Sequence, residues 1–321
     1  MMSSILEAVL LVALAVVILY AVFGLIGTTS VVGKHPEWRK MVASPSDYGL
    51  ESKIVGLSSS DGTSLSAWWL PSRQKARGTV ILAHGLGSNK SRMLPRASFL
   101  VGGGYNVFDL DLRTHGESGG NYMTPGYLEA QDIIAGTEYA FQANCERPIV
   151  VMGHSYGAVA ALRAATQTSK VQAVISDSAF ITQSDMMHRV RKETLNDKST
   201  PFPLKFGISL VGLPLMNQSI RFFLYLRTRR WIGNDSKISA LAACKHLEGK
   251  SVLFIAGEND VIAPPENTQK MYEATSSRTK EILILPGVGH STYKLGLKPY
   301  EQKVLEFLGG ITVSDGRMGQ N

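Results

Sequence analysis

A serine between two glycines, in the run Gly-His-Ser-Tyr-Gly at residues 153–157, constrains this chain more than any other feature. The apolar residues 148–152 before it predict a buried strand, and the small residues 158–166 after it predict a helix. Glycines are needed where a sharp strand-to-helix turn brings backbone against backbone, and such a turn lifts the central hydroxyl clear of the strand end. Ser155 is therefore the candidate nucleophile.

A serine hydroxyl attacks poorly until an imidazole takes its proton, and an acid must orient that imidazole. Residues 251–256 predict a strand that runs into a loop holding Asp260, which is the candidate acid. Residues 281–285 predict another strand, and the glycine-containing loop after it holds His290, which is the candidate base. The expected catalytic groups thus follow one another as Ser, Asp and His along the chain.

Two further motifs stand upstream: His84-Gly85-Leu86-Gly87 after a predicted strand, and the run Asp-Leu-Arg-Thr-His-Gly-Glu-Ser at 111–118. With these motifs and this catalytic order, the region from about Lys53 to Leu308 resembles an α/β-hydrolase of the serine-aminopeptidase and monoacylglycerol-lipase-like group. The resemblance implies that the backbone N–H groups of Leu86 and Tyr156 form an oxyanion hole. It implies a reaction that needs no cofactor and no metal.

Alternatives to these site residues remain. Asp177, at the end of a predicted strand, is a rival acid, because some α/β-hydrolases carry the acid after that earlier strand. His84 and His115 are structural by the family pattern, each hydrogen-bonding its own loop. The other histidines lack ligand-like spacing with carboxylates or cysteines, so the sequence does not favour a metal site.

Strand and helix patterns alternate through most of the chain. Predicted strands near residues 79, 106, 149, 171, 252 and 282 are separated by helical patterns, and an Asp-Gly hairpin joins 53–58 to 64–70. This alternation predicts the α/β-hydrolase fold, a mostly parallel sheet with helices on both faces and the reacting groups at the strand ends. We expect an anchor at 1–27, a linker at 28–52, the hydrolase domain at 53–310 and a flexible tail at 311–321.

The chain from Ile5 to Ile26 is apolar except for Glu7. As a helix it spans ~33 Å, about the thickness of a bilayer's hydrocarbon core. A cleavable signal peptide is the competing interpretation, but no Lys or Arg precedes the run and no small-residue cleavage site follows it. We therefore predict a single-pass membrane protein. Lys34, Arg39 and Lys40 after the helix favour a cytoplasmic catalytic domain.

The interval 181–243 is too long for an ordinary connection and is predicted to be a lid insertion. Residues 188–231 contain nine lysines and arginines against two acids, together with many large apolar side chains. Two interpretations stay open: a lid that lies on an anionic membrane surface and guides acyl chains, or a cap with a solvated basic rim. Nucleic-acid binding is disfavoured, because no RNA- or DNA-binding motif accompanies the charge.

These features predict a serine hydrolase that cleaves ester-type bonds of small or lipid-like acyl substrates through an acyl-enzyme intermediate. A peptidase, a thioesterase and an acyltransferase of the same fold remain alternatives, as does a non-catalytic membrane-tethered binding protein. No acidic cluster in the predicted lid marks a pocket for a peptide's free amine, which counts against a peptidase. The sequence does not set the acyl-chain length or the oligomeric state.

Overall fold

Eight strands form one sheet in the computed structural model, which describes residues 2–202, 239–293 and 297–311, and residues 205, 209, 218–219, 221–223 and 225–226 of the insertion. In spatial order the sheet runs β1-β2-β4-β3-β5-β6-β7-β8. The strands are β1 (Lys53–Ser58), β2 (Ser64–Leu70), β3 (Thr79–Ala83), β4 (Asn106–Leu110), β5 (Ile149–His154), β6 (Ala173–Asp177), β7 (Ser251–Gly257) and β8 (Lys280–Leu285).

The sheet is mostly parallel, as predicted. β1 pairs antiparallel with β2, which confirms the predicted hairpin, and β2 pairs antiparallel with β4. Every other neighbouring pair is parallel. The central strands β3, β4 and β6 are buried along their whole length, as their continuous β-branched and apolar residues require. Their carboxyl ends therefore meet at one edge, where β5 delivers Ser155.

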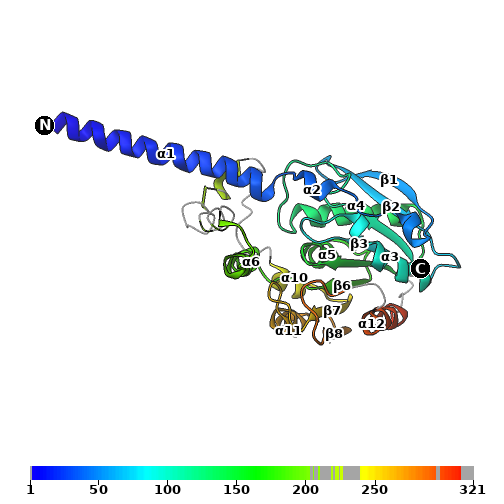
Figure 1. The fold of residues 1–321 in the computed structure, drawn as a ribbon. Coiled ribbons are helices and arrows are strands. Elements are labelled where there is room, and N and C mark those ends of the chain that lie inside the picture. The colour runs from blue at the N-terminus through cyan, green and yellow to red at the C-terminus, as the bar shows by residue number, and fades with distance from the viewer. Residues whose placement is uncertain are drawn as a thin grey trace, which may run out of the picture.

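Helices cover both faces of this sheet (Figure 1). On one face lie α4 (Leu128–Gln142), α5 (Tyr156–Ala165), α10 (Ala240–Cys244) and α11 (Pro265–Ala274). On the other lie α3 (Leu94–Gly102) and α12 (Lys298–Gly309). The shorter elements are α2 (Pro36–Arg39) and the 3₁₀ turns η1 (Pro45–Tyr48) and η2 (Lys90–Arg92). The predicted α/β architecture is confirmed.

The first helix, α1 (Met2–Val32), projects away from the domain as a long rod (Figure 1). Its stretch Ile5–Ile26 is long and apolar enough to cross a membrane, and only 6% of its most apolar part is buried by the rest of the molecule. Apolar side chains exposed along a whole helix are what a surrounding bilayer would cover.

The insertion leaves the sheet after β6 and returns at α10. It starts with α6 (Gln183–Asn196), whose first turn is capped by the Thr182 hydroxyl, and ends where the Ser239 hydroxyl caps α10. Between these helices the Ala240 N–H donates to the Ile181 carbonyl at 3.1 Å, so the chain leaves and rejoins the domain at one point. Most of the predicted lid between 203 and 238, and the tail from 312 onward, lies outside the described residues.

Candidate active site

Ser155 occupies a strained turn between β5 and α5, with φ 53° and ψ −113°. A side chain in this region of backbone space carries a cost that the surrounding structure must offset. The two flanking glycines make the turn possible. A Cβ on Gly157 would lie 2.3 Å from the Ala83 carbonyl oxygen, and one on Gly153 would lie 2.2 Å from that of Gly157. The predicted elbow is therefore present, and its glycines are needed because backbone approaches backbone.

Ser155, His290 and Asp260 form one chain of hydrogen bonds. His290 Nε2 lies 2.9 Å from Ser155 Oγ, and His290 Nδ1 lies 2.8 Å from Asp260 Oδ2. The serine and the aspartate are buried, whereas the histidine side chain is about a quarter exposed, at 23%. An aspartate on Nδ1 holds the proton there, and this leaves Nε2 as the acceptor that faces the serine hydroxyl.

The acid is held in place by its own loop. Asp260 Oδ1 accepts backbone N–H bonds from Ile262 at 2.9 Å and Ala263 at 2.8 Å, which leaves Oδ2 for His290. The acid loop is tied to the histidine loop, because Asn259 N–H donates to the Val288 carbonyl at 2.8 Å. The two loops thus present acid and base in a fixed relation.

The predicted oxyanion donors belong to segments that lie next to Ser155. Tyr156 is the first residue of α5, so its N–H has no acceptor within the helix. Leu86 follows Gly85, where an added Cβ would lie 3.4 Å from Ser155 Cβ. Among the described residues, neither the Tyr156 N–H nor the Leu86 N–H donates to a protein acceptor. Both are therefore available to a negative oxygen near Ser155.

His84 and His115 brace the loop that carries Leu86. His84 Nδ1 pairs with the Gly85 carbonyl at 2.8 Å, while its Nε2 accepts the Leu112 N–H at 3.0 Å. His115 repeats the pattern, with Nδ1 on the Arg113 carbonyl and Nε2 accepting the Gly87 N–H. Both arrangements need a neutral ring. Burial accordingly lowers the pKa of His84 well below its usual value and that of His115 to about 4.

Asp177, the rival acid, lies in a different network. Its buried carboxylate accepts hydrogen bonds from Arg96 Nη2 at 2.7 Å, Tyr300 Oη at 2.8 Å and Thr292 Oγ1 at 2.5 Å. Although burial alone would raise it, the pKa of Asp177 is held far below its usual value, chiefly by the Arg96 guanidinium. The His290 ring bonds Asp260 and not Asp177.

Arg96, Thr292 and Tyr300 were not singled out from the sequence. They come from α3, from the histidine loop and from α12, and no motif links residues so far apart. Asp177 also accepts the Ser155 N–H through its own carbonyl, at 2.7 Å. The network therefore ties the nucleophile turn to the loop that carries His290.

The predicted linker contributes a second set of contacts that the sequence did not reveal. The Trp38 ring stacks on His115, with centroids 4.7 Å apart and planes at 5°. The Trp38 carbonyl accepts the Asn89 Nδ2–H at 3.0 Å and the Gly116 N–H at 3.1 Å. Residues after α1 thus support the loops on which Leu86 and His115 lie.

Asp111 and Arg113 secure the loop beneath the site. Asp111 accepts the Lys90 N–H at 2.7 Å and forms an ion pair with the buried Lys90 ammonium at 2.6 Å. Arg113 pairs with Asp132 and Asp61. Within the described part of the chain, no three His, Cys, Asp or Glu side chains gather as metal ligands would.

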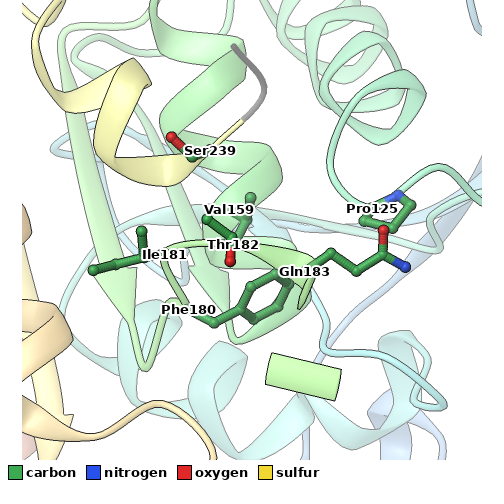
Figure 2. Close-up of a pocket in the computed structure, with 7 residues that line it drawn as sticks. All are labelled: Pro125, Val159, Phe180, Ile181, Thr182, Gln183 and Ser239. Atoms are coloured by element: carbon green, nitrogen blue, oxygen red, sulfur yellow. The ribbon is translucent and has the colours of Figure 1, made fainter. Parts of the chain in front are cut away.

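A small cavity of about 10 Å³ lies at the base of the insertion, beside α5, with room for about one water molecule. Figure 2 shows its lining, with Gln183 extending toward Pro125; the other residues are Val159, Phe180, Ile181, Thr182 and Ser239. The Val159 N–H donates to the Ser155 carbonyl, so the cavity is one helical turn from the nucleophile. The insertion therefore starts and ends beside the catalytic helix.

Comparison with known proteins agrees with this fold. Residues 74–204 match a protein family described as serine aminopeptidase, S33. The protein bem46 of Schizosaccharomyces pombe is 26% identical over 277 residues, which cover 84% of this chain and 81% of that protein. An uncharacterized membrane protein of Saccharomyces cerevisiae is 22% identical over 262 residues, which cover 80% of this chain and 81% of that protein.

Among solved structures, an esterase of Pyrococcus furiosus superposes with a TM-score of 0.70 at 25% identity. The match covers 87% of this chain and 97% of the esterase. The fold of this chain therefore has a counterpart in a protein named as an esterase.

Proposed function

We propose that this chain, which has the α/β-hydrolase fold, is a serine hydrolase that cleaves carboxylic esters with Ser155, His290 and Asp260. One observation carries the proposal: the hydrogen-bond chain from Ser155 Oγ through both nitrogens of His290 to Asp260 Oδ2. A serine hydroxyl elsewhere on a protein surface has no base placed to take its proton.

In the proposed reaction, His290 Nε2 takes the Ser155 proton as the oxygen attacks the ester carbonyl. The tetrahedral oxyanion accepts hydrogen bonds from the Leu86 and Tyr156 N–H groups, while Asp260 stabilises the imidazolium. The imidazolium then gives its proton to the leaving alcohol, and the acyl-enzyme remains. Water repeats the sequence on the acyl-enzyme and releases the carboxylic acid, with His290 again as base and then as acid.

An ester substrate is favoured over a peptide by likeness to the Pyrococcus esterase along nearly its whole length. The family described as serine aminopeptidase supports a peptidase as the second candidate. A substrate panel separates the two. We expect turnover of p-nitrophenyl esters of graded acyl length and little turnover of aminoacyl naphthylamides; the reverse preference would support the peptidase.

The mechanism is tested with a fluorophosphonate probe on the full chain in detergent. We expect the wild type to label and Ser155→Ala not to label. Ser291→Ala, which changes an exposed serine beside His290, is the matched control and should label as the wild type does. A folded wild type that resists the probe, or a Ser155→Ala variant that still reacts, would contradict the proposal and favour a non-catalytic binding protein.

We also propose that α1 anchors the protein as a single membrane span, with the catalytic domain on the cytoplasmic side. The support is the apolar stretch Ile5–Ile26, the positive residues Lys34, Arg39 and Lys40 after it, and the likeness to a yeast membrane protein. Protease added to intact cells should spare the catalytic domain. Its digestion without permeabilisation would reverse the orientation.

A further inference from the structure

One turn of the membrane helix is covered by the insertion. Along Ile5–Ile26 the side chains are exposed until Tyr20, and Gly24 alone among these residues is buried. What covers it is Phe223: a Cβ on Gly24 would lie 2.2 Å from Phe223 Cδ2 and 3.2 Å from Ser219 Cβ. The aromatic ring therefore lies directly on the helix backbone, at a position that only glycine allows.

The covering residues belong to a helical, partly apolar stripe. Residues 218–219, 221–223 and 225–226 are helical, and at ~100° per residue Ser219, Phe222, Phe223 and Leu226 fall within about 100° of one another. Ser219 and Phe223 touch α1, whereas Phe222 and Leu226 beside them are 40% and 41% exposed. We call the part that carries these four residues the α1-docked segment. One flank of its stripe is covered by the anchor and the other faces outward.

The position of the Gly24–Phe223 contact along α1 indicates what surrounds the outward-facing flank of the α1-docked segment. Gly24 is two residues before Ile26, so the contact is about 3 Å inside the end of the apolar span. Phe222 is the neighbour of Phe223 and Leu226 follows three residues later, about 5 Å along the segment, so both lie close to this end of the apolar span, where hydrocarbon meets the headgroups. Arg221 in the same segment, and Lys34 and Lys40 just beyond α1, add positive charge near the headgroups.

The same insertion starts and ends beside α5, the helix that follows Ser155. Ile181 and Ser239, at its two ends, line the small cavity beside α5, the helix that begins after Ser155 (Figure 2). In Figure 1 the yellow-green parts of the insertion lie beside the end of α1 nearest the domain. The insertion whose ends lie beside α5 is thus the segment that touches α1.

We propose that the α1-docked segment lies in the surface of the bilayer, with Phe222 and Leu226 in hydrocarbon, and that the site therefore takes long-chain acyl esters dissolved in that bilayer. The proposal names the substrate class of the serine hydrolase proposed above and rests on it. In this arrangement α1 is a structural partner of the insertion as well as a tether.

The contact itself is tested by disulfide trapping in full-length protein in phosphatidylcholine–phosphatidylglycerol nanodiscs. A Gly24→Cys, Phe223→Cys pair removes the ring that a Cβ at residue 24 would meet, and it leaves the two Cβ atoms near disulfide distance, which is about 3.5–4.5 Å. Ala15→Cys with Phe223→Cys is the control, because Ala15 is exposed about 13 Å further along α1. We expect mild oxidation to link the first pair only. No link, or equal links in both pairs, would overturn the docking.

The substrate class is tested by comparing two esters in the same nanodiscs. 4-Methylumbelliferyl oleate resides in the bilayer, and p-nitrophenyl butyrate is water-soluble. Gly24→Leu should push Phe223 off α1 and lower oleate turnover roughly tenfold, with butyrate turnover within about twofold of the wild type. Ala15→Leu, which also introduces a leucine into α1 but at an exposed position, should alter neither rate. If Gly24→Leu leaves both rates unchanged, or lowers both equally, the inference is wrong.

The bilayer contact of the outer flank is tested with Phe222→Asp. A carboxylate in hydrocarbon is costly, so oleate turnover should fall while butyrate turnover and fluorophosphonate labelling persist. Ile54→Asp, at an exposed position on edge strand β1, is the matched control and should leave the ratio unchanged. Failure of the proposed function would look different: the wild type would hydrolyse neither ester and would not label.

Discussion

Asp177 and Thr292 are joined by a hydrogen bond of 2.5 Å, two residues beyond the histidine that faces the nucleophile. Asp177 therefore holds the histidine loop through the side chain of Thr292, whereas Asp260 contacts the imidazole itself. Two aspartates at neighbouring strand ends thus make separate contacts: Asp260 bonds the ring of His290, and Asp177 holds the loop that carries His290.

The matched variants Asp260→Asn and Asp177→Asn should separate these roles. Asp260→Asn cannot hold the Nδ1 proton, so we expect turnover to fall on the order of 10⁴-fold with a nearly unchanged melting temperature. Asp177→Asn leaves the buried Arg96 guanidinium unpaired and should lower the free energy of unfolding by about 3–5 kcal/mol. Thermal unfolding and ester kinetics measure both. Strong loss of turnover in a fully folded Asp177→Asn, with Asp260→Asn active, would exchange the two assignments.

Acid should destabilise the fold through His115. The pKa of His115 is lowered to about 4 by burial, from an ordinary value of 6.5. Between these pH values the unfolded chain binds a proton that the folded chain does not, so stability falls as pH falls through this window. The loss amounts to on the order of 3 kcal/mol near pH 4. Urea titrations at pH 7, 5.5 and 4.5 measure it. His115→Gln should make the free energy of unfolding less dependent on pH between 7 and 4.5. An unchanged pH dependence in this variant would contradict the assignment to His115.

The elbow glycines should tolerate no side chain. Gly157→Ala places a methyl 2.3 Å from the Ala83 carbonyl oxygen, so the turn must shift. We expect loss of fluorophosphonate labelling and a destabilisation of about 1–3 kcal/mol. Gly102→Ala is the control, because nothing lies within 4 Å of a Cβ there. It should be neutral or stabilising by up to about 1 kcal/mol. Equal behaviour of the two variants in labelling and thermal melts would contradict the steric argument.

Two truncations should differ, although both remove the anchor. A chain starting at residue 34 keeps Trp38, whereas one starting at residue 42 loses its ring contact with His115 and the hydrogen bonds to its carbonyl. We expect the shorter chain to be less stable by roughly 2–4 kcal/mol. Melting temperatures in one buffer decide this. Identical values would mean that residues 34–41 do not support the loops near the site.

The sequence predicted the features of the site that depend on residues close together in the chain. An apolar run, two glycines and a helix-forming stretch set the turn at Ser155, and the strands before Asp260 and His290 indicated loops at the same sheet edge. The register that brings these loops within hydrogen-bonding distance follows from the parallel pairing of β6, β7 and β8. The strand pattern in the sequence and the parallel pairing of the strands therefore together placed Ser155, Asp260 and His290 at the carboxyl edge of the sheet.

The supporting contacts could not be predicted in this way. Arg96 and Tyr300 are 81 and 123 residues from Asp177 in the sequence, and the identity of an arginine or a tyrosine does not indicate which distant residue it contacts. Trp38 lies in a stretch whose composition is that of a linker, and its stacking on His115 depends on how the loops come together. The Gly24 contact likewise joins two segments whose sequences are both explained by other roles.

The bond between the Ala240 N–H and the Ile181 carbonyl has a consequence for how such enzymes diversify. Because the chain departs and returns at one closed point, the intervening residues can lengthen, shorten or be replaced without moving β6, β7 or the side chains at their ends. Closing a longer loop costs little more than closing a shorter one, about 0.6 kcal/mol for each doubling of its length. Substrate preference can thus change when the residues between Ile181 and Ala240 are replaced, while the side chains at the carboxyl edge of the sheet keep their positions.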